Sequence, residues 1–591
     1  MKKILTILCI GGMLSTPQYL SGQQETAIAT DPPQVRVRIP FPTSSAEPSV
    51  RAPGAASSYK YRYSRPSSRA ENTGLSIYRE NIRGDSLDLV IEQAALAEYK
   101  AQIPGLSVLR AVPALDHSDM AANLAGALTF QKYPTYEQYD SMMHYFADTY
   151  PSICRIDTFG TSVEGRLLLA LKISDNVEEE EDEPTFLYTS TMHGDELVGY
   201  VLCLRLADFL LSNYGPNEEV NRIINDVELW INPVSNPDGT YYPDNNSTVQ
   251  ASIRNNVNGV NLNRDFPDPK YGEPDDATGR QPETQHMMAF MKQIRPNLSA
   301  NIHSGAEVVN YPWDHKNPWH PDHNWFILIS REYAEVARSV NSSYMLFADD
   351  SIGITGITNG FDWYDILGGR QDYVTYYLHG RELTLELSYI KRLESELLDA
   401  HWNYNKWSLV NLVSQSRYGI HGNVTDQSGN PVRAVIRVLD HDNDSSWVES
   451  DPGSGNFYRY LEEGVYDLLI TSEGFFPDTV FGMEVLDYQK TPLAVQLISR
   501  ETNTNAPAGV SSMHVYPNPA QYVLHIQTYS AFVSSTKITV SDLSGRTMIT
   551  TIPPEGTSRF ELDVSTLQSG VYVLRRSGDN HAGTVIFSIQ Y

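Results

Sequence analysis

The chain has 591 residues and a formal net charge of −28, and 41% of its residues are hydrophobic. This length allows several domains of about 100–200 residues each, and the apolar content is ordinary for globular protein. The negative charge excludes a nucleic-acid-binding protein, because no basic stripe is available to neutralise phosphates.

The N-terminus, residues 1–22, has the pattern of a secretory signal peptide. Lys2 and Lys3 precede a short apolar segment, and small residues follow near Gly22. The segment is too short to anchor a protein in a membrane, and no other long apolar stretch predicts a transmembrane helix. We therefore expect an exported protein. In the mature chain Cys154 and Cys203 could pair or stay free.

Four further parts follow the signal peptide. Residues 23–130 begin as a Pro-, Ser- and Arg-rich leader and could include a pro-segment. Residues 131–415 open with a predicted amphipathic helix that ends before Pro151, and strands then alternate with helices, which predicts an α/β domain with a mixed sheet. Residues 418–499 and 511–591 show short alternating strands and turn residues, which predicts two small all-β sandwich domains.

A candidate metal site begins in the α/β part. His193 and Glu196 lie directly after an apolar run at 185–191 that predicts a strand, and His303 follows another short apolar segment. Two imidazoles and a carboxylate are ligands that a catalytic zinc ion accepts, with a water in the remaining position. The sequence therefore predicts one Zn²⁺ site.

Charged residues that suit peptide hydrolysis follow along the chain. Arg254 and Arg264 lie in a turn-rich stretch, where one arginine could stabilise an oxyanion and the other could bind a carboxylate. Glu386 lies between Leu385 and Leu387 in an apolar strand, which suits either a general base or a structural ion pair.

The region from about 133 to 413 resembles the zinc metallocarboxypeptidases, and within them the branch of carboxypeptidases D, E, M and N. The resemblance rests on six stretches in family order: HGDELVG, NPDG, RNNVNGVNLNRDFPD, IHSGAEVVNYPWD, NGFDWYDILGGRQD and LTLELSYIK. The next segment, HGNVTDQSGNPV, resembles the transthyretin-like β-sandwich that accompanies this branch.

The resemblance implies a zinc-dependent exopeptidase and a role for each matched residue. The zinc ligands would be His193, Glu196 and His303. Glu386 would be the general base and Arg254 would stabilise the oxyanion. The residues that bind the free C-terminal carboxylate of the substrate would be Asn263, Arg264 and Tyr364.

Specificity would depend on Asp314, eleven positions after His303, and on Gln371. A carboxylate in the side-chain pocket favours C-terminal Lys or Arg. Arg370 stands where the branch usually has methionine, and a cation near the pocket would oppose a basic substrate. Asn261 replaces an acidic residue usual in the family, so that we expect it to hold Arg264 through a neutral amide.

The C-terminal part, with VYPNPA, VSDLSGR and LQSGVYVLRR, resembles the sorting domain of proteins that the type IX secretion system of Bacteroidetes exports. This implies a secreted or surface-attached protein whose partners are peptide substrates and the secretion machinery.

Alternatives are a carboxypeptidase for aliphatic or cell-wall peptides and a non-catalytic binding protein. The spacing of His315, His320 and His323 fits no strong metal template, and no Gly-x-Ser-x-Gly elbow supports a serine hydrolase.

Overall fold

The computed structural model describes four strands before residue 113, residues 117–500 and residues 513–590. Positions 96, 100, 101 and 115 are also described, and positions 180, 244–245, 348–350, 529–530, 544 and 579–582 are left out. The predicted signal peptide and most of the predicted leader lie outside the described residues.

The four N-terminal strands form an antiparallel sheet. β1 (Gln34–Pro40) lies between β3 (Ser86–Glu92) and β4 (Ser107–Val112), and β2 (Tyr78–Arg83) pairs with β3. β1 therefore places a strand in the stretch that composition alone assigns to a flexible leader.

A mixed eight-stranded sheet organises the α/β part. In spatial order its strands are β11 (Ile357–Asn359), β10 (Ala306–Tyr311), β12 (Arg381–Ser388), β9 (Leu298–His303), β7 (Thr185–Ser190), β8 (Glu228–Asn232), β6 (Leu167–Ile173) and β5 (Cys154–Thr161). The central strands β12, β9, β7 and β8 run parallel, whereas β5 and β6 pair antiparallel. All residues of β7, β9 and β12 are buried, because helices cover both faces of the sheet.

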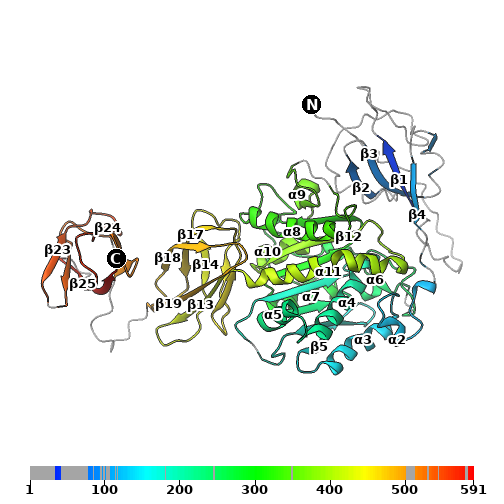
Figure 1. Cartoon of the computed structure of the whole chain (residues 1–591), viewed down its shortest axis with the longest axis horizontal. Helices are drawn as coiled ribbons and strands as arrows, with labels where there is room; N and C mark the ends of the chain where they lie inside the picture. Colours follow the sequence, from blue (N-terminus) through cyan, green and yellow to red (C-terminus); the bar gives the residue numbers. More distant parts are fainter. Residues whose placement is uncertain are drawn as a thin grey trace. The chain divides into compact units, whose positions relative to one another are not determined.

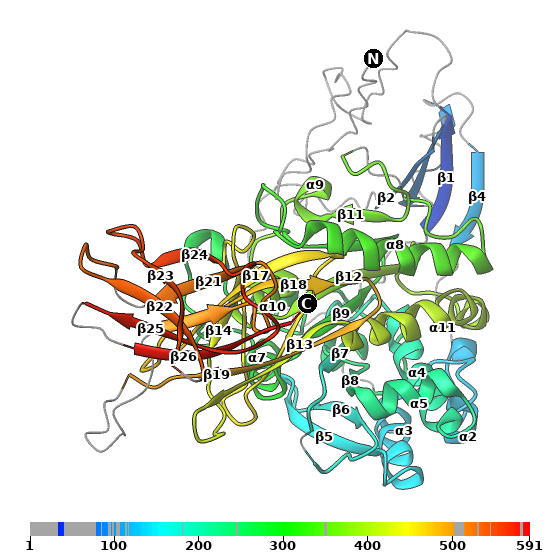
Figure 2. The ribbon, with the colours of Figure 1, turned by 60° about the vertical axis from the view of Figure 1, so that its left-hand side comes forward.

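Two layers of helices cover these faces, and the sheet lies between them in Figure 2. One face packs against α3 (Tyr136–Thr149), α4 (Val198–Asn213), α5 (Glu218–Asp226), α8 (His323–Val340) and α11 (Leu398–Ser414). The other packs against α7 (Pro282–Ile294) and α10 (Arg370–Tyr377). Short helices α2 (Leu124–Ala127), α6 (Pro237–Thr240) and α9 (Gly360–Trp363) connect the larger elements.

The predicted helix before Pro151 is confirmed as α3. It begins with a capping box, in which Thr135 and Gln138 each accept a hydrogen bond from the other residue's backbone N–H. Tyr139, Met142, Met143 and Phe146 form its buried face. The apolar run at 185–191 is confirmed as strand β7.

The first predicted β-sandwich is present. One sheet contains β16 (Asn456–Arg459), β13 (Gly419–Asp426) and β19 (Lys490–Leu497), and the other contains β15 (Val448–Glu449), β14 (Val435–Val438), β17 (Gly464–Thr471) and β18 (Asp478–Val485). Alternate residues such as Ile436, Val438, Leu468 and Ile470 form the core between the sheets.

The second β-sandwich is a compact unit of its own. The chain divides into Met1–Ser499 and Arg500–Tyr591 (Figure 1). The second unit contains the sheet of β20 (Met513–Tyr516), β21 (Val523–Thr528) and β24 (Arg559–Asp563). Its other sheet contains β23 (Thr547–Thr551), β22 (Lys537–Asp542), β25 (Gly570–Ser577) and β26 (Gly583–Ile589). Among the described residues, every helix is too short or too polar to cross a membrane.

Candidate active site

The site begins with an alternation of side chains in β9 and β12. In β9, Leu298, Ala300 and Ile302 belong to the core beneath α4 and α11, so Asn301 and His303 point to the opposite face. In β12, the residues that belong to this core are Leu383, Leu385 and Leu387, which leaves Glu382, Thr384 and Glu386 on the polar face. Glu386 is the register partner of His303, so the two side chains lie next to each other.

His193 and Glu196 come from the loop between β7 and α4. This loop packs closely on the turn at 237–240. A Cβ at Gly194 would lie 2.3 Å from the carbonyl carbon of Gly239 and 2.6 Å from the carbonyl oxygen of Ile253. Only glycine fits there, and its close approach directs His193 and Glu196 toward the end of β9.

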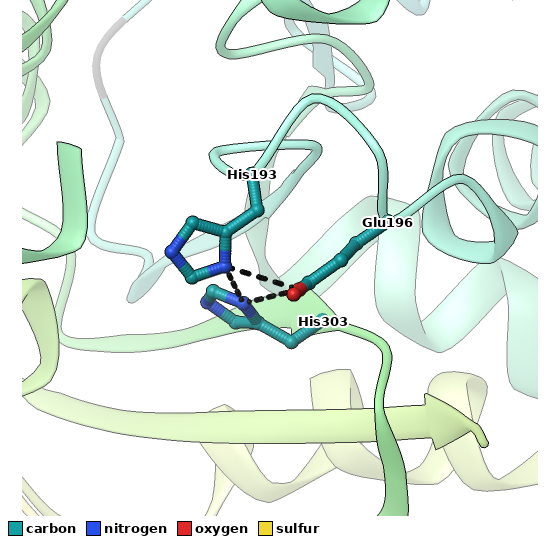
Figure 3. Close-up of side chains that lie close together, drawn as sticks. All are labelled: His193, Glu196 and His303. Atoms are coloured by element: carbon teal, nitrogen blue, oxygen red, sulfur yellow. Dashed lines mark hydrogen bonds and ion pairs between the residues drawn. The ribbon is translucent and has the colours of Figure 1, made fainter. Parts of the chain in front are cut away.

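The three predicted metal ligands converge (Figure 3). Oε2 of Glu196 lies 2.8 Å from Nδ1 of His303 and 3.1 Å from Nδ1 of His193, and the two Nδ1 atoms are 3.0 Å apart. Burial, together with the charge of Arg254, holds the pKa of His193 well below its ordinary value, which keeps this imidazole neutral. Two buried imidazole nitrogens and a carboxylate oxygen aimed at one point fit a zinc ion.

Glu386 lies beside this cluster with an unsatisfied oxygen. The residue is 8% exposed, and its Oε2 has no hydrogen-bond partner among the described residues. Burial and the nearby charge of Glu196 raise the pKa of Glu386 to about 8. The ionised form of a carboxyl group with this pKa can accept a proton from water.

Two cations face the other oxygen of Glu196. Arg254 Nη1 lies 2.7 Å from Oε1 of Glu196, and Lys391 Nζ lies 3.2 Å from the same atom. The side chain of Arg254 is 33% exposed, whereas that of Lys391 is 15% exposed. Arg254 is therefore the more accessible of the two to a substrate. The sequence did not predict Lys391. It lies five residues after Glu386, beyond the end of β12, so the alternation of side chains along the strand does not indicate where it points.

The predicted carboxylate-binding residues lie in one neighbourhood. Asn263 is buried, and its Oδ1 accepts a hydrogen bond from the backbone N–H of Arg370 at 3.0 Å, which leaves its NH₂ group to donate. Arg264 Nη1 donates to the carbonyl of Asn263. Burial raises the pKa of Tyr364 to about 12, although the charge of Arg264 acts against this rise. The phenol of Tyr364 is therefore a hydrogen-bond donor at neutral pH.

The sequence predicted that Asn261 holds Arg264. In the structure its side chain contacts two other groups. Its backbone carbonyl accepts from the backbone N–H of Arg264, but its side-chain Oδ1 accepts from Nε2 of His193 and from the backbone N–H of Asn263, both at 3.0 Å. The residue thus joins the metal cluster to the carboxylate-binding loop.

The predicted specificity residue Asp314 is buried together with Gln371. Oδ1 of Asp314 accepts hydrogen bonds from Gln371 Nε2 at 2.9 Å and from Asn310 Nδ2 at 3.2 Å. Oε1 of Gln371 and Oδ1 of Asn310 are buried and have no hydrogen-bond partner among the described residues. Burial and the neighbouring charge of Asp372 raise the pKa of Asp314 well above its ordinary value. These side chains therefore form a buried cluster with unpaired amide oxygens.

Arg370 is not a free cation beside this cluster, which corrects the expectation that its charge would be unpaired near the predicted specificity residues. Its side chain is fully buried, and Nε and Nη2 donate to the two carboxylate oxygens of Glu382 at 2.9 and 2.8 Å. Nη1 donates to Oγ1 of Thr189. Glu382 lies on the polar face of β12, so the positive charge is neutralised within the sheet layer.

The histidines of the 315–323 loop have separate partners. His315 Nδ1 lies 2.6 Å from Asp372, His320 packs edge-on against Phe326, and the ring of His323 stacks on Trp319 at 3.9 Å. Cys154 and Cys203 are both free and buried.

Comparison with known proteins decides the family. Residues 139–406 match the profile of the zinc carboxypeptidases. Carboxypeptidase SOL1 of Arabidopsis thaliana is 36% identical over 58% of this chain and 68% of its own length. Mouse carboxypeptidase M is 33% identical over 59% of this chain and 80% of its own length. The chain belongs to the zinc carboxypeptidase family. As a member of this family it is a zinc-dependent exopeptidase.

Other comparisons cover only part of a relative or only the C-terminal part of this carboxypeptidase. Human carboxypeptidase D is 33% identical over 56% of this chain but only 24% of its own length. Residues 514–589 match the profile of the secretion system C-terminal sorting domain. The predicted resemblance to a sorting domain is therefore confirmed, in the second compact unit of the carboxypeptidase.

Proposed function

We propose that the chain is a secreted zinc carboxypeptidase that removes C-terminal Lys or Arg from peptides and proteins. The observation that carries the proposal is the buried acceptor set around Asp314. A guanidinium or ammonium group offers only donors, so it would satisfy the Asp314 carboxylate and the free oxygens of Gln371 and Asn310. An apolar side chain would leave the buried oxygens of Gln371 and Asn310 unpaired.

In this proposal His193, Glu196 and His303 hold the zinc ion. The neutral imidazole of His193 and the single carboxylate of Glu196, both close to His303, support the assignment. Zinc bound there would supply a polarised scissile carbonyl and a water of lowered pKa.

The chain's own residues would position and protonate the substrate. Asn263, Arg264 and Tyr364 bind the terminal carboxylate, which confines cleavage to the last peptide bond. Arg254 turns from Glu196 toward the scissile carbonyl and stabilises the oxyanion. Glu386 accepts the proton of the attacking water through its unpartnered Oε2 and passes it to the leaving amine.

We assign the catalytic domain to residues 131–415, a transthyretin-like β-sandwich to 418–499 and the sorting domain to 511–591, with a signal peptide at 1–22. Residues 23–130 would form a leader or pro-segment. The match of residues 514–589 supports export through the type IX secretion machinery of a Bacteroidetes-like cell, to the medium or the outer surface.

The decisive experiment measures hydrolysis of matched peptides that end in Arg, Lys, Phe, Ala and amidated Arg, with and without a chelator. We expect release of Arg and Lys only, no cleavage of the amidated peptide, and loss of activity with chelator. Release of Phe or Ala instead would retain the exopeptidase mechanism and contradict the role of Asp314. No release from any peptide would favour a binding protein.

A further inference from the structure

We propose that two asparagine amides, Asn261 and Asn301, orient the zinc histidines. The inference rests on the ligand set of the proposed function. Each imidazole directs Nδ1 toward the proposed metal position, so Nε2 must carry the proton and needs an acceptor. Nε2 of His193 lies 3.0 Å from Oδ1 of Asn261, and Nε2 of His303 lies 2.6 Å from the amide of Asn301.

The amide of Asn301 is held in place by a hydrogen bond to the neighbouring strand. The residue is 1% exposed and lies two positions before His303 on the same face of β9. One end of its amide faces His303, and the other end lies 2.9 Å from Oγ1 of Thr189. Thr189 is the register partner of Asn301 in β7.

The orientation that the Asn301 amide needs follows from the ligand role of His303. The structure places Nδ2 toward His303 and Oδ1 toward Thr189. A half-turn of the amide exchanges these atoms with little change in shape. Oδ1 then accepts the Nε2–H of His303, and Nδ2 donates to Oγ1 of Thr189. This orientation leaves Nδ1 of His303 unprotonated for the metal.

A buried ion pair between Arg370 and Glu382 holds Thr189 in turn. Oγ1 of Thr189 also accepts a hydrogen bond from Nη1 of Arg370, whose guanidinium is fixed by both oxygens of Glu382. Ser299 donates to the same carboxylate at 2.7 Å. Arg370 thereby anchors Thr189 and, through it, Asn301 and His303. This gives the arginine a positioning role in the metal site.

Both acceptors are neutral amides, and this has a consequence for metal affinity. Among the described residues, neither Nε2 atom has a carboxylate partner. Loss of either amide should therefore weaken zinc binding about 10–100-fold, the usual effect of removing such a partner. Replacement by aspartate keeps the acceptor and adds negative charge, so zinc should bind at least as tightly.

The experiment measures the zinc dissociation constant of the full chain by competition with a chelator. The variants Asn261→Ala and Asn301→Leu remove the acceptors, and Asn261→Asp and Asn301→Asp retain them. Thr189→Val removes the hydroxyl that orients Asn301 and nearly preserves side-chain shape. Asn258→Ala is the matched control, because Asn258 is exposed in the same loop as Asn261 and donates only to Gln281 in the described contacts.

We expect weaker zinc binding by Asn261→Ala, Asn301→Leu and Thr189→Val. Wild-type affinity in folded Asn261→Ala or Asn301→Leu would overturn the proposal. Equal weakening in Asn301→Asp and Asn301→Leu would attribute the effect to packing and also overturn it. If Asn301→Leu does not fold, Asn261→Ala and Thr189→Val decide. Wild-type zinc affinity in His303→Ala would instead contradict the ligand set itself.

Discussion

At the scale of single residues, the partner of a buried charge decides its role. Asp314 contacts Gln371, which follows Arg370 in the chain, and the side chains of Asp314 and Arg370 are both buried. Arg370 has its counter-charge in Glu382, whereas the contacts of Asp314 are amide donors. Burying a charge without a hydrogen-bonded ion-pair partner is costly, so Asp314 is the group that gains most from a cationic ligand.

The first prediction concerns Asp314→Asn. We expect kcat/KM for peptides ending in Arg to fall about 100–1,000-fold, since truncating one member of a buried charge pair costs roughly 2–5 kcal/mol. Activity toward a peptide ending in Ala should change little. The measurement is kcat/KM for both peptides, and equal losses for the two would contradict a specificity role.

The second prediction concerns Gly360, which lies against the same carboxylate. A Cβ at this position would lie 1.7 Å from Oδ1 of Asp314. Gly360→Ala should therefore displace Asp314 and reduce kcat/KM for basic peptides about tenfold or more, within the usual 1–3 kcal/mol cost of overpacking. Gly126→Ala serves as control, because its Cβ would meet nothing closer than 3.6 Å. Unchanged kinetics in Gly360→Ala would show that the pocket can adjust.

The third prediction concerns Glu386 and pH. Burial and Glu196 raise the pKa of Glu386, so the carboxyl holds its proton to higher pH than an exposed glutamate. A protonated base cannot accept a proton, so kcat/KM should fall as the pH falls through this pKa, which a bound dication would lower. Glu386→Gln should reduce kcat about 100–10,000-fold. A profile of kcat/KM against pH that stays flat on the acid side would contradict this assignment.

At the scale of elements, strands β9 and β12 carry both the core and the site because side chains alternate between the two faces of a sheet. The apolar residues of each strand pack beneath α4 and α11, and the polar residues face the metal cluster. The same alternation in the sequence, LSANIH and ELTLEL, could have indicated Asn301 and Glu382. Their roles could not be predicted, because their partners lie in other elements.

A buried ion network also joins the sandwich to the catalytic part. Asp322, which precedes α8, accepts hydrogen bonds from Arg381 Nε at 2.7 Å and from Arg459 Nη2 of β16 at 2.7 Å. Arg459 also donates to Asp442 at 2.6 Å. The side chains of Asp322, Asp442 and Arg459 are all fully buried.

The fourth prediction is that Arg459→Met destabilises the first unit by about 3–5 kcal/mol, because it leaves two buried carboxylates short of a partner. Arg433→Met is the matched control. Arg433 pairs with Glu449 but its side chain is 67% exposed, so its loss should cost less than about 1 kcal/mol. Chemical unfolding of both variants tests the difference, and equal stabilities would contradict it.

The same network predicts acid sensitivity. Despite the opposing effect of burial, Arg459 lowers the pKa of Asp442 to about 2. A depressed pKa stabilises the fold above the unfolded-state pKa of about 4, and this contribution is lost as the pH falls toward 2. Acid unfolding between these values should therefore be shallower in Asp442→Asn than in the wild type.

At the scale of the whole molecule, the chain consists of two compact units with separate hydrophobic cores. The sandwich of residues 419–497 belongs to the same unit as the catalytic sheet, and Trp325 of α8 stacks on Tyr460 at 5.3 Å. Loss of the last unit should therefore affect the first much less than loss of this sandwich.

The fifth prediction compares two truncations. A chain that ends at Ser499 should keep the thermal unfolding of the first unit and its peptidase activity, since the core of that unit is intact. A chain that ends at Arg417 lacks Arg459 and Tyr460, so it should unfold at a clearly lower temperature or fail to fold. Calorimetry and peptide hydrolysis test both. Equal stability of the two truncations would contradict an integral role for the sandwich.

Local patterns in the sequence predicted the α/β class, the small β-sandwiches and the three candidate metal ligands, which the structure brings together. These features depend on local alternation, turn chemistry and short motifs, which are written within a few consecutive residues. Tertiary structure decided what those patterns could not contain. Arg370 meets Thr189 across 181 positions and Asn261 meets His193 across 68, so whether each group supports the metal or faces the substrate depends on strand order and packing.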